Sequence, residues 1–196
     1  DDEMYSFYSD TDSCYVTCET LVDNFFPDKD TDKVVGLLDK IATDKIEPAI
    51  AQAMAKLGNY TNAFEHKIDF KREVIADKGV FVAKKRYALN VLDDEGLRLK
   101  EPKLKVMGLE IVRSSTPAPI RDSLKEAVRL ILTSEEEELH KYIETTKSEF
   151  IDMNAEKIAF PRGCNNLRKY TSASDIYQKG TPIHVRGSLL YNNLLE

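Results

Sequence analysis

An acidic triplet between two β-prone runs constrains the fold of this chain more than any other feature. Asp10-Thr11-Asp12 interrupts the segment 5–17, in which aromatic residues precede the triplet and β-prone residues follow it. This pattern predicts two short strands joined by a tight turn that carries the carboxylates. Side chains two residues apart on extended backbone point to the same side, so Asp10 and Asp12 are expected to lie together.

Two neighbouring carboxylates repel each other unless a positive charge offsets them. A divalent cation with phosphate ligands is a common arrangement, and Asp10 and Asp12 are therefore candidate metal ligands. The alternative is an acidic turn without any ligand, because Asp favours turns in general.

The charges are unevenly distributed along the 196 residues of the chain. Taken as a whole, the net charge of −6 argues against a nucleic-acid partner. Residues 1–66 carry a balance of −9, whereas residues 67–130 carry +5 and residues 131–196 carry −2. An acidic part that can hold cations therefore precedes a basic part that can hold phosphates.

Cysteine usage and hydropathy indicate the compartment. Cys14, Cys18 and Cys164 form no Cys-x-x-Cys pair, so reduced thiols in an intracellular protein are expected. No apolar run approaches membrane-spanning length, and no signal-peptide pattern opens the chain. Because the chain begins without Met and enters a strand pattern almost at once, we expect it to be a piece of a longer protein.

Hydrophobic periodicity predicts an α+β fold, with an antiparallel sheet and packed helices followed by a mainly helical part. The expected elements of the first part are a helix over 19–26, a long helix over 34–58 with a bend near Pro48, strands over 66–76, 80–83 and 87–92, and a hairpin turn over 93–96. The apolar stripe of the long helix is expected to be core. After Pro102, helix entries are expected at Ser114 and Ser134, followed by a looser segment over 155–186.

A strongly basic cluster is formed by Lys84-Lys85-Arg86-Tyr87. On a strand, Lys85 and Tyr87 would share one side while Lys84 and Arg86 take the other. A nucleic-acid backbone would explain three adjacent cations, and so would a solvated edge strand that Lys protects from aggregation. Glu73, on a preceding predicted strand, is expected either to add a carboxylate to the metal site or to pair with a neighbouring Lys.

Two further basic groups are candidates for phosphate contacts. Arg121, Lys125 and Arg129 recur at intervals of four residues and form one ridge on a predicted helix. Arg168 and Lys169 lie in the looser segment 155–186, which carries a balance of +4. A plain surface loop is the alternative for this second group.

These motifs together resemble a known family. The run Tyr8-Ser9-Asp10-Thr11-Asp12-Ser13 resembles the Tyr-Gly-Asp-Thr-Asp-Ser signature of family B DNA polymerases, with Ser9 in place of Gly. Lys84-Lys85-Arg86-Tyr87 resembles the Lys-Lys-Arg-Tyr motif that lies near the primer terminus in this family. The order of motifs is similar to that in the replicative polymerases of tailed bacteriophages, with further matching runs at 47–50, 101–105, 107–110, 114–117 and 183–187.

The resemblance implies a domain organisation and roles for the candidate residues. Residues 1–106 would be the C-terminal part of a palm domain, and residues 107–196 the N-terminal and middle part of a thumb. Two Mg²⁺ ions would assist phosphoryl transfer, with Asp12 as a direct ligand and Asp10 beside it. Lys85 and Tyr87 would hold the primer end, while Lys84 and Arg86 contact its backbone. The basic residues expected to grip the duplex are Arg121, Lys125, Arg168 and Lys169.

The resemblance also implies partners outside this chain. They are primer–template DNA, a dNTP and the remainder of the polymerase chain, with no membrane partner and with any sliding-clamp contact made by parts not present here. The expected location is the cytoplasm, that of the host if a phage encodes the protein.

A second catalytic Asp and a Lys-bearing fingers helix have no matching pattern in this sequence. The isolated chain is therefore expected not to polymerise. Lys71 stands where phage relatives carry an acid, which weakens the case for a metal site at Glu73.

Two readings from other functional classes stay open. One is a non-catalytic DNA-binding module in which the carboxylate hairpin is vestigial. The other is a palm-like nucleotidyl transferase or cyclase that uses the same hairpin. Such an enzyme needs no thumb, so the basic ridge on the predicted thumb helix argues against it.

Overall fold

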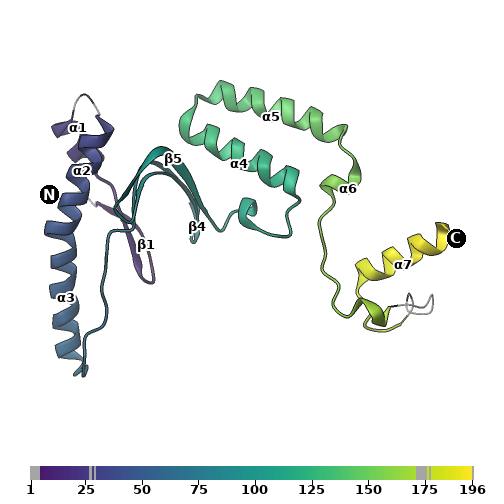
Figure 1. The fold of residues 1–196 in the computed structure, drawn as a ribbon, viewed down its shortest axis with the longest axis horizontal. Coiled ribbons are helices and arrows are strands. Elements are labelled where there is room, and N and C mark those ends of the chain that lie inside the picture. Colours follow the sequence, from purple (N-terminus) through teal and green to yellow (C-terminus); the bar gives the residue numbers. More distant parts are fainter. Residues whose placement is uncertain (1–4, 27, 29, 171–175, 177, 196) are drawn as a thin grey trace.

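The computed structural model describes residues 5–26, 28, 30–170, 176 and 178–195. Antiparallel sheets and helices make up this part of the chain, which confirms the predicted α+β fold. Figure 1 shows the sheets and the first helices at one end of an elongated arrangement and α7 at the other. Within the described residues, no helix is both long enough and apolar enough to span a membrane.

The predicted N-terminal hairpin is confirmed. Strand β1 (Ser6–Asp10) pairs antiparallel with β2 (Ser13–Val16), and Asp10 lies opposite Ser13. Two residues, Thr11 and Asp12, therefore close the turn. Tyr8 lies opposite Tyr15, so that the hairpin presents aromatic side chains next to its acidic tip.

A second sheet has the order β3 (Val74–Ala83), β4 (Arg86–Asp94) and β5 (Leu97–Met107), all antiparallel. The prediction of one strand over 66–76 and another over 80–83 is wrong, because a single strand begins at Val74 and continues to Ala83. The preceding residues bond to helices instead: the backbone N–H of Arg72 donates to Glu47 Oε1 at 2.9 Å. Strand β5 continues through Pro102 to Met107. Strand β5 lies at the edge of this sheet, where a residue without an N–H is tolerated.

The predicted turn over 93–96 is confirmed between β4 and β5. Asp94 lies opposite Leu97, so Glu95 and Gly96 form a two-residue turn. Both have positive φ angles, 52° for Glu95 and 87° for Gly96. Two successive residues in this region give the twist that a tight hairpin requires.

The N-terminal helices are α1 (Glu19–Phe25), α2 (Thr31–Ile41) and α3 (Glu47–Tyr60), with a π-helical turn, η1, over Ala42–Ile46. The predicted bend near Pro48 is therefore an interruption just before it. Pro48 has no N–H to donate to the carbonyl four residues earlier, and the π-turn occurs where that bond is missing.

The predicted core stripe along these helices holds for α2 but is wrong for α3. Val35 of α2 is buried against Ile75 and Leu92 of the sheet. No residue of α3 is buried, and Leu57 is 50% exposed. Figure 1 shows why, since α3 extends past the sheet instead of lying on it.

The C-terminal half contains η2 (Glu110–Val112), α4 (Ala118–Thr133), α5 (Glu136–Ile151), α6 (Ala155–Ile158), η3 (Leu167–Lys169) and α7 (Ile183–Leu195). Helix α7 is not predicted from the sequence, and the N-cap of α5 is Glu135 instead of the predicted Ser134. Part of the predicted loop over 155–186 lies outside the described residues.

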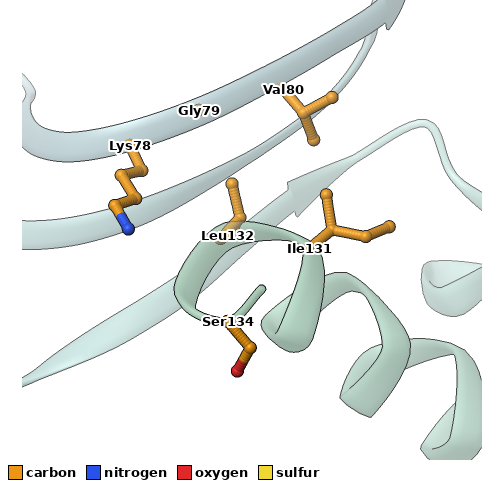
Figure 2. Close-up of a pocket in the computed structure, with 6 residues that line it drawn as sticks. All are labelled: Lys78, Gly79, Val80, Ile131, Leu132 and Ser134. Atoms are coloured by element: carbon orange, nitrogen blue, oxygen red, sulfur yellow. The ribbon is translucent and has the colours of Figure 1, made fainter. Parts of the chain in front are cut away.

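Helix α4 joins the two halves of the chain because it contacts β3 and β4. Figure 2 shows its last turn beneath β3, with Ile131 and Leu132 directed towards the strand and Val80 facing them. Leu132 is buried in this contact, whereas Ile131 is half exposed. The expected boundary at 106/107 falls just before the last residue of β5, and α4 packs back onto the sheet.

Candidate active site at two hairpin turns

Two hairpin turns meet at one point of the structure. The first is the Thr11–Asp12 turn between β1 and β2, and the second is the Lys84–Lys85 turn between β3 and β4. The backbone N–H of Lys85 donates to Tyr8 Oη at 2.7 Å. Lys85 Nζ lies 3.5 Å from Asp10 Oδ2. The structure thus brings together the acidic motif and the basic motif, which are more than 70 residues apart in the sequence.

The acidic turn differs from the expected geometry. Thr11 has a φ of 46°, so the backbone between the two aspartates is not extended and the predicted alignment of their side chains by alternation is wrong. The N–H of Asp12 donates to the carbonyl of Asp10 at 2.5 Å, and Ser13 Oγ donates to the same carbonyl at 3.2 Å. Thr11 Oγ1 donates to Asp10 Oδ1 at 3.2 Å. These bonds fix the tip tightly.

The two carboxylates have different surroundings. The Asp10 side chain is 19% exposed and pairs with Lys85, so its charge is partly offset by the protein. Asp12 is exposed, and no residue in the described part of the chain pairs with its carboxylate. Asp12 is therefore open to a ligand from outside this chain, whereas a ligand at Asp10 would compete with the ammonium group.

The donor chemistry of the turn fits a divalent cation such as Mg²⁺, which prefers carboxylate oxygens. Two carboxylates do not complete its coordination shell. Among the described residues, no group of three or more acidic, His or Cys side chains gathers closely enough to hold a metal ion. Any ion at Asp12 would need further ligands from water, a phosphate substrate or another part of a larger protein.

The basic motif forms a turn, and its predicted strand alternation is wrong. Lys84 and Lys85 are the two residues between paired Ala83 and Arg86, and Lys85 has a φ of 61°. Arg86 begins β4 and donates to the carbonyl of Gly108 at 3.2 Å and to Glu110 Oε2 at 2.8 Å. Arg86 thus ties β4 to η2, while Lys84 is exposed.

Gly108 lies against the Lys84–Lys85 turn, a role that no pattern in the sequence predicts. It has a φ of 66°, a conformation that side chains with a Cβ rarely adopt. A Cβ at this position would lie 2.1 Å from the carbonyl oxygen of Lys85. The turn can therefore approach β5 only because residue 108 is Gly.

An aromatic cluster joins the β1–β2 hairpin to the three-stranded sheet. Its members are Phe7, Tyr8, Tyr15, Phe81 and Tyr87, with ring centroids 5.0–6.1 Å apart in the contacting pairs. The Tyr15 hydroxyl donates to Tyr87 Oη at 2.6 Å. Burial, then this hydrogen bond and the nearby charges, raises the pKa of Tyr15 above its ordinary value. Tyr87 itself is only 8% exposed.

Glu73 and Arg72 lie just before β3. The Glu73 carboxylate accepts a hydrogen bond from Lys105 Nζ, as in the alternative that pairs it with a neighbouring Lys. Arg72 donates to Asp39 of α2 and to the buried Asp93 of β4, each at 2.5 Å. Burial opposes the guanidinium charge, but the two carboxylates outweigh it and raise the pKa of Arg72. The Glu73 carboxylate is thus paired with the ammonium group of Lys105, and the structure gives no support for Glu73 as a metal ligand.

The remaining basic candidates lie on α4 and η3. In α4, Arg121 is half-buried and Lys125 is exposed, while Arg129 pairs with Glu126, which raises the pKa of Arg129. Arg168 and Lys169 form most of η3, and Lys169 Nζ lies 5.9 Å from the centre of the Tyr170 ring. Figure 1 shows this yellow-green turn beside α7, far from β3 and β4. The structure does not bring these residues together with the Lys84–Lys85 turn.

Comparison with known proteins gives consistent similarities. Residues 4–155 match the family model described as Divergent Family B DNA polymerase. The chain is 39% identical over 204 residues to a DNA-directed DNA polymerase of Escherichia phage RB69, an alignment that covers 99% of this chain and 22% of that relative. It is 35% identical over 205 residues to a DNA-directed DNA polymerase of Enterobacteria phage T4, with 100% and 23% covered. The chain therefore spans less than a quarter of the length of these relatives.

Proposed function

Because the chain belongs to the divergent family B DNA polymerases, we propose that it is part of an enzyme that extends a DNA primer on a template with dNTPs. The observation that carries the proposal is the meeting of the two turns, with Lys85 Nζ 3.5 Å from Asp10 Oδ2. A carboxylate turn can bind the metal ions that accompany a triphosphate, and a basic turn next to it can bind a DNA strand. In this proposal, residues 1–106 are the C-terminal part of the palm, and residues 107–196 are the N-terminal and middle part of the thumb.

The acidic turn supplies the metal-binding half of the chemistry. Asp12, exposed at the tip, holds one of two Mg²⁺ ions directly, and Asp10 lies beside it and sets the local field. When bound, the two ions lower the charge cost of in-line attack by the primer 3′-hydroxyl on the incoming triphosphate. The hydrogen bonds of Thr11 and Ser13 keep the tip rigid, so that the carboxylates need little rearrangement on binding.

The basic turn positions the primer end. Lys85 and Tyr87 hold the terminal nucleotide, and Lys84, whose ammonium is exposed, contacts the backbone. Arg86 contacts the backbone only with the part of its guanidinium that Gly108 and Glu110 leave free. Its main contribution is therefore to hold the turn in place.

The helical half of the chain grips duplex DNA through phosphates without reading its sequence. The residues that carry this contact are Arg121, Lys125, Arg168 and Lys169. The distance of η3 from the two turns in Figure 1 suits a duplex that extends away from the primer terminus. Glu73 is no more than an auxiliary carboxylate, because Lys105 already pairs with it.

The rest of the active site is supplied by other parts of the polymerase. A second catalytic Asp, a fingers Lys for the triphosphate and any sliding-clamp contact lie outside these 196 residues in this proposal. Because the relatives named above are phage proteins, we place the enzyme in the cytoplasm of a host cell.

Primer extension tests the proposal. The longer polymerase that contains this chain should extend a labelled primer with four dNTPs and Mg²⁺, and EDTA should abolish extension until Mg²⁺ is restored. The isolated 196-residue chain should show no incorporation under the same conditions. An inactive longer protein would contradict the proposal, and clear incorporation by the isolated chain would contradict the claim that its site is incomplete.

One observation favours a second candidate, a non-catalytic DNA-binding module with a vestigial hairpin. Lys85 already offsets part of the charge of Asp10, so this carboxylate does not need a metal ion as its partner. In that case, replacing Asp12 by Ala in the longer polymerase would leave both primer extension and salt-dependent duplex binding unchanged. Loss of extension with binding retained would exclude it.

A further inference from the structure

The hydroxyl groups of Tyr15 and Tyr87 are joined by a hydrogen bond. Tyr15 Oη donates to Tyr87 Oη at 2.6 Å across the interface between the β1–β2 hairpin and the three-stranded sheet. A phenol can accept hydrogen bonds and donate one. Because Tyr87 accepts here, its own proton is left to donate elsewhere, and no described residue accepts it.

The surroundings of Tyr15 maintain this direction. Its ring centroid lies 5.3 Å from that of Phe81 and 5.4 Å from those of Tyr8 and Tyr87, which leaves little freedom to turn away. Burial, the Tyr87 hydroxyl and the field of Glu73 favour the protonated form of Tyr15, which raises its pKa. Tyr15 therefore keeps the proton that it donates to Tyr87.

The Tyr87 ring is held almost as firmly. It stacks on Phe81 with centroids 5.1 Å apart and an interplanar angle of 27°. With the ring fixed, the only remaining freedom of Tyr87 is rotation of its hydroxyl proton, and the bond from Tyr15 removes most of it. Tyr87 thus presents a hydroxyl donor whose orientation depends on Tyr15 of β2.

We propose that Tyr15 is a positioning residue that orients the Tyr87 hydroxyl as a hydrogen-bond donor to the primer end. This inference rests on the proposed function, in which Tyr87 contacts the primer. Tyr15 touches neither the primer nor the metal in this account and acts only through Tyr87. Removing the Tyr15 hydroxyl would free the Tyr87 proton to rotate and would leave every other contact of the cluster in place.

A double-mutant cycle in the longer polymerase tests the inference. The variants are Tyr15→Phe, Tyr87→Phe and the pair, and the readouts are the KM for primer–template, kcat and the thermal midpoint. Tyr15→Phe should raise KM about three- to tenfold, the factor expected from one hydrogen bond, with kcat and thermal midpoint nearly unchanged. In the Tyr87→Phe background the same change should have no further effect on KM.

A matched control is Tyr142→Phe, which also removes a phenol that donates one hydrogen bond, to the carbonyl of Ser123 at 3.2 Å in the α4–α5 contact. It should leave KM unchanged. The inference is overturned if the effects of Tyr15→Phe and Tyr87→Phe on KM multiply, if Tyr15→Phe matches the control, or if Tyr87→Phe has no effect. Each of these results can occur in an active polymerase and so differs from failure of the proposed function, which is loss of primer extension by the unmodified enzyme.

Discussion

Arg72 shows how much of the sheet's stability depends on single side chains. It lies before β3 and binds Asp39 of α2 and Asp93 of β4, while its backbone N–H binds Glu47 of α3. Asp93 is 4% exposed and also accepts from the N–H of Gly96. One ion-pair network therefore joins the N-terminal helices to the β4–β5 turn.

Replacing Asp93 by Ala should destabilise the fold by about 3 kcal/mol, because it leaves a largely buried guanidinium with only one carboxylate. Urea unfolding of the chain and of the variant measures the difference. The neighbouring Asp94 pairs with the exposed Lys103, so Asp94→Ala should cost less than about 1 kcal/mol. Equal losses in the two variants would contradict the account of this network.

Tyr15 should make stability depend on pH in the alkaline range. Its pKa is raised in the folded state, so the folded chain keeps the proton at a pH where the unfolded chain loses it. The contribution is complete below pH 10, the ordinary Tyr value, and is lost as pH rises above it. Urea midpoints measured from pH 8 to pH 11 should fall less steeply for Tyr15→Phe than for the unmodified chain. Parallel curves would contradict this.

At the scale of elements, the Lys84–Lys85 turn depends on its close contact with the segment between β5 and η2. Gly108→Ala would place a Cβ against the carbonyl of Lys85 at a positive φ. We expect a loss of at least about 1 kcal/mol in urea unfolding and displacement of the basic turn from Asp10.

The control for this change is Gly36→Ala in α2. A Cβ at Gly36 meets no atom within 4 Å, and Ala favours a helix, so this variant should gain about 0.5–1 kcal/mol. In the longer polymerase, Gly108→Ala should slow primer extension while Gly36→Ala does not. Equal stability of the two variants would contradict the tight contact at Gly108.

The elements differ in how well the sequence predicts them. Alternating and turn-forming residues are sufficient for the β1–β2 hairpin and for the Glu95–Gly96 turn, because both are local. The Lys84–Lys85 turn contains no Gly, Asn or Asp, and its left-handed residue is held by Tyr8 from a distant strand. Such long-range support leaves no local pattern in the sequence.

The candidate site is likewise only partly predictable. The motifs identify Asp10, Asp12 and the Lys84–Tyr87 run, but they do not reveal that Lys85 pairs with Asp10 or that Tyr15 bonds to Tyr87. These contacts depend on how one hairpin packs on another sheet. The pairing of Glu73 with Lys105 has the same origin.

At the scale of the whole molecule, the proposed function assigns the contact with duplex DNA to the helical half of the chain. The exposed Lys125 and half-buried Arg121 of α4 should contribute to duplex binding through phosphates. Changing both to Ala in the longer polymerase should weaken binding equally for different sequences and reduce the slope of log affinity against log salt by about 2. Arg129→Ala is the comparison, and because Arg129 already pairs with Glu126 it should change the slope less. A slope unchanged in the double variant would contradict the grip assigned to α4.

The proposed metal site at the acidic turn is the central element of the proposed function. Two carboxylates lie at one turn, one paired with Lys85 and one open, and the remaining ligands are assigned to other parts of a chain more than four times as long in the relatives. In the proposed function, Asp12 therefore acts in the chemical step and does not hold the DNA.

Single-turnover incorporation by the longer polymerase tests this assignment directly. Asp12→Asn keeps the shape of the side chain and removes its charge, so the rate of nucleotide incorporation at saturating Mg²⁺ should fall by at least about 1,000-fold. The Kd for primer–template should change by less than about twofold. Asp94→Asn, at an acidic residue away from the turn, should leave both quantities unchanged. A rate for Asp12→Asn within tenfold of the unmodified enzyme would contradict the claim that this hairpin carries a catalytic carboxylate.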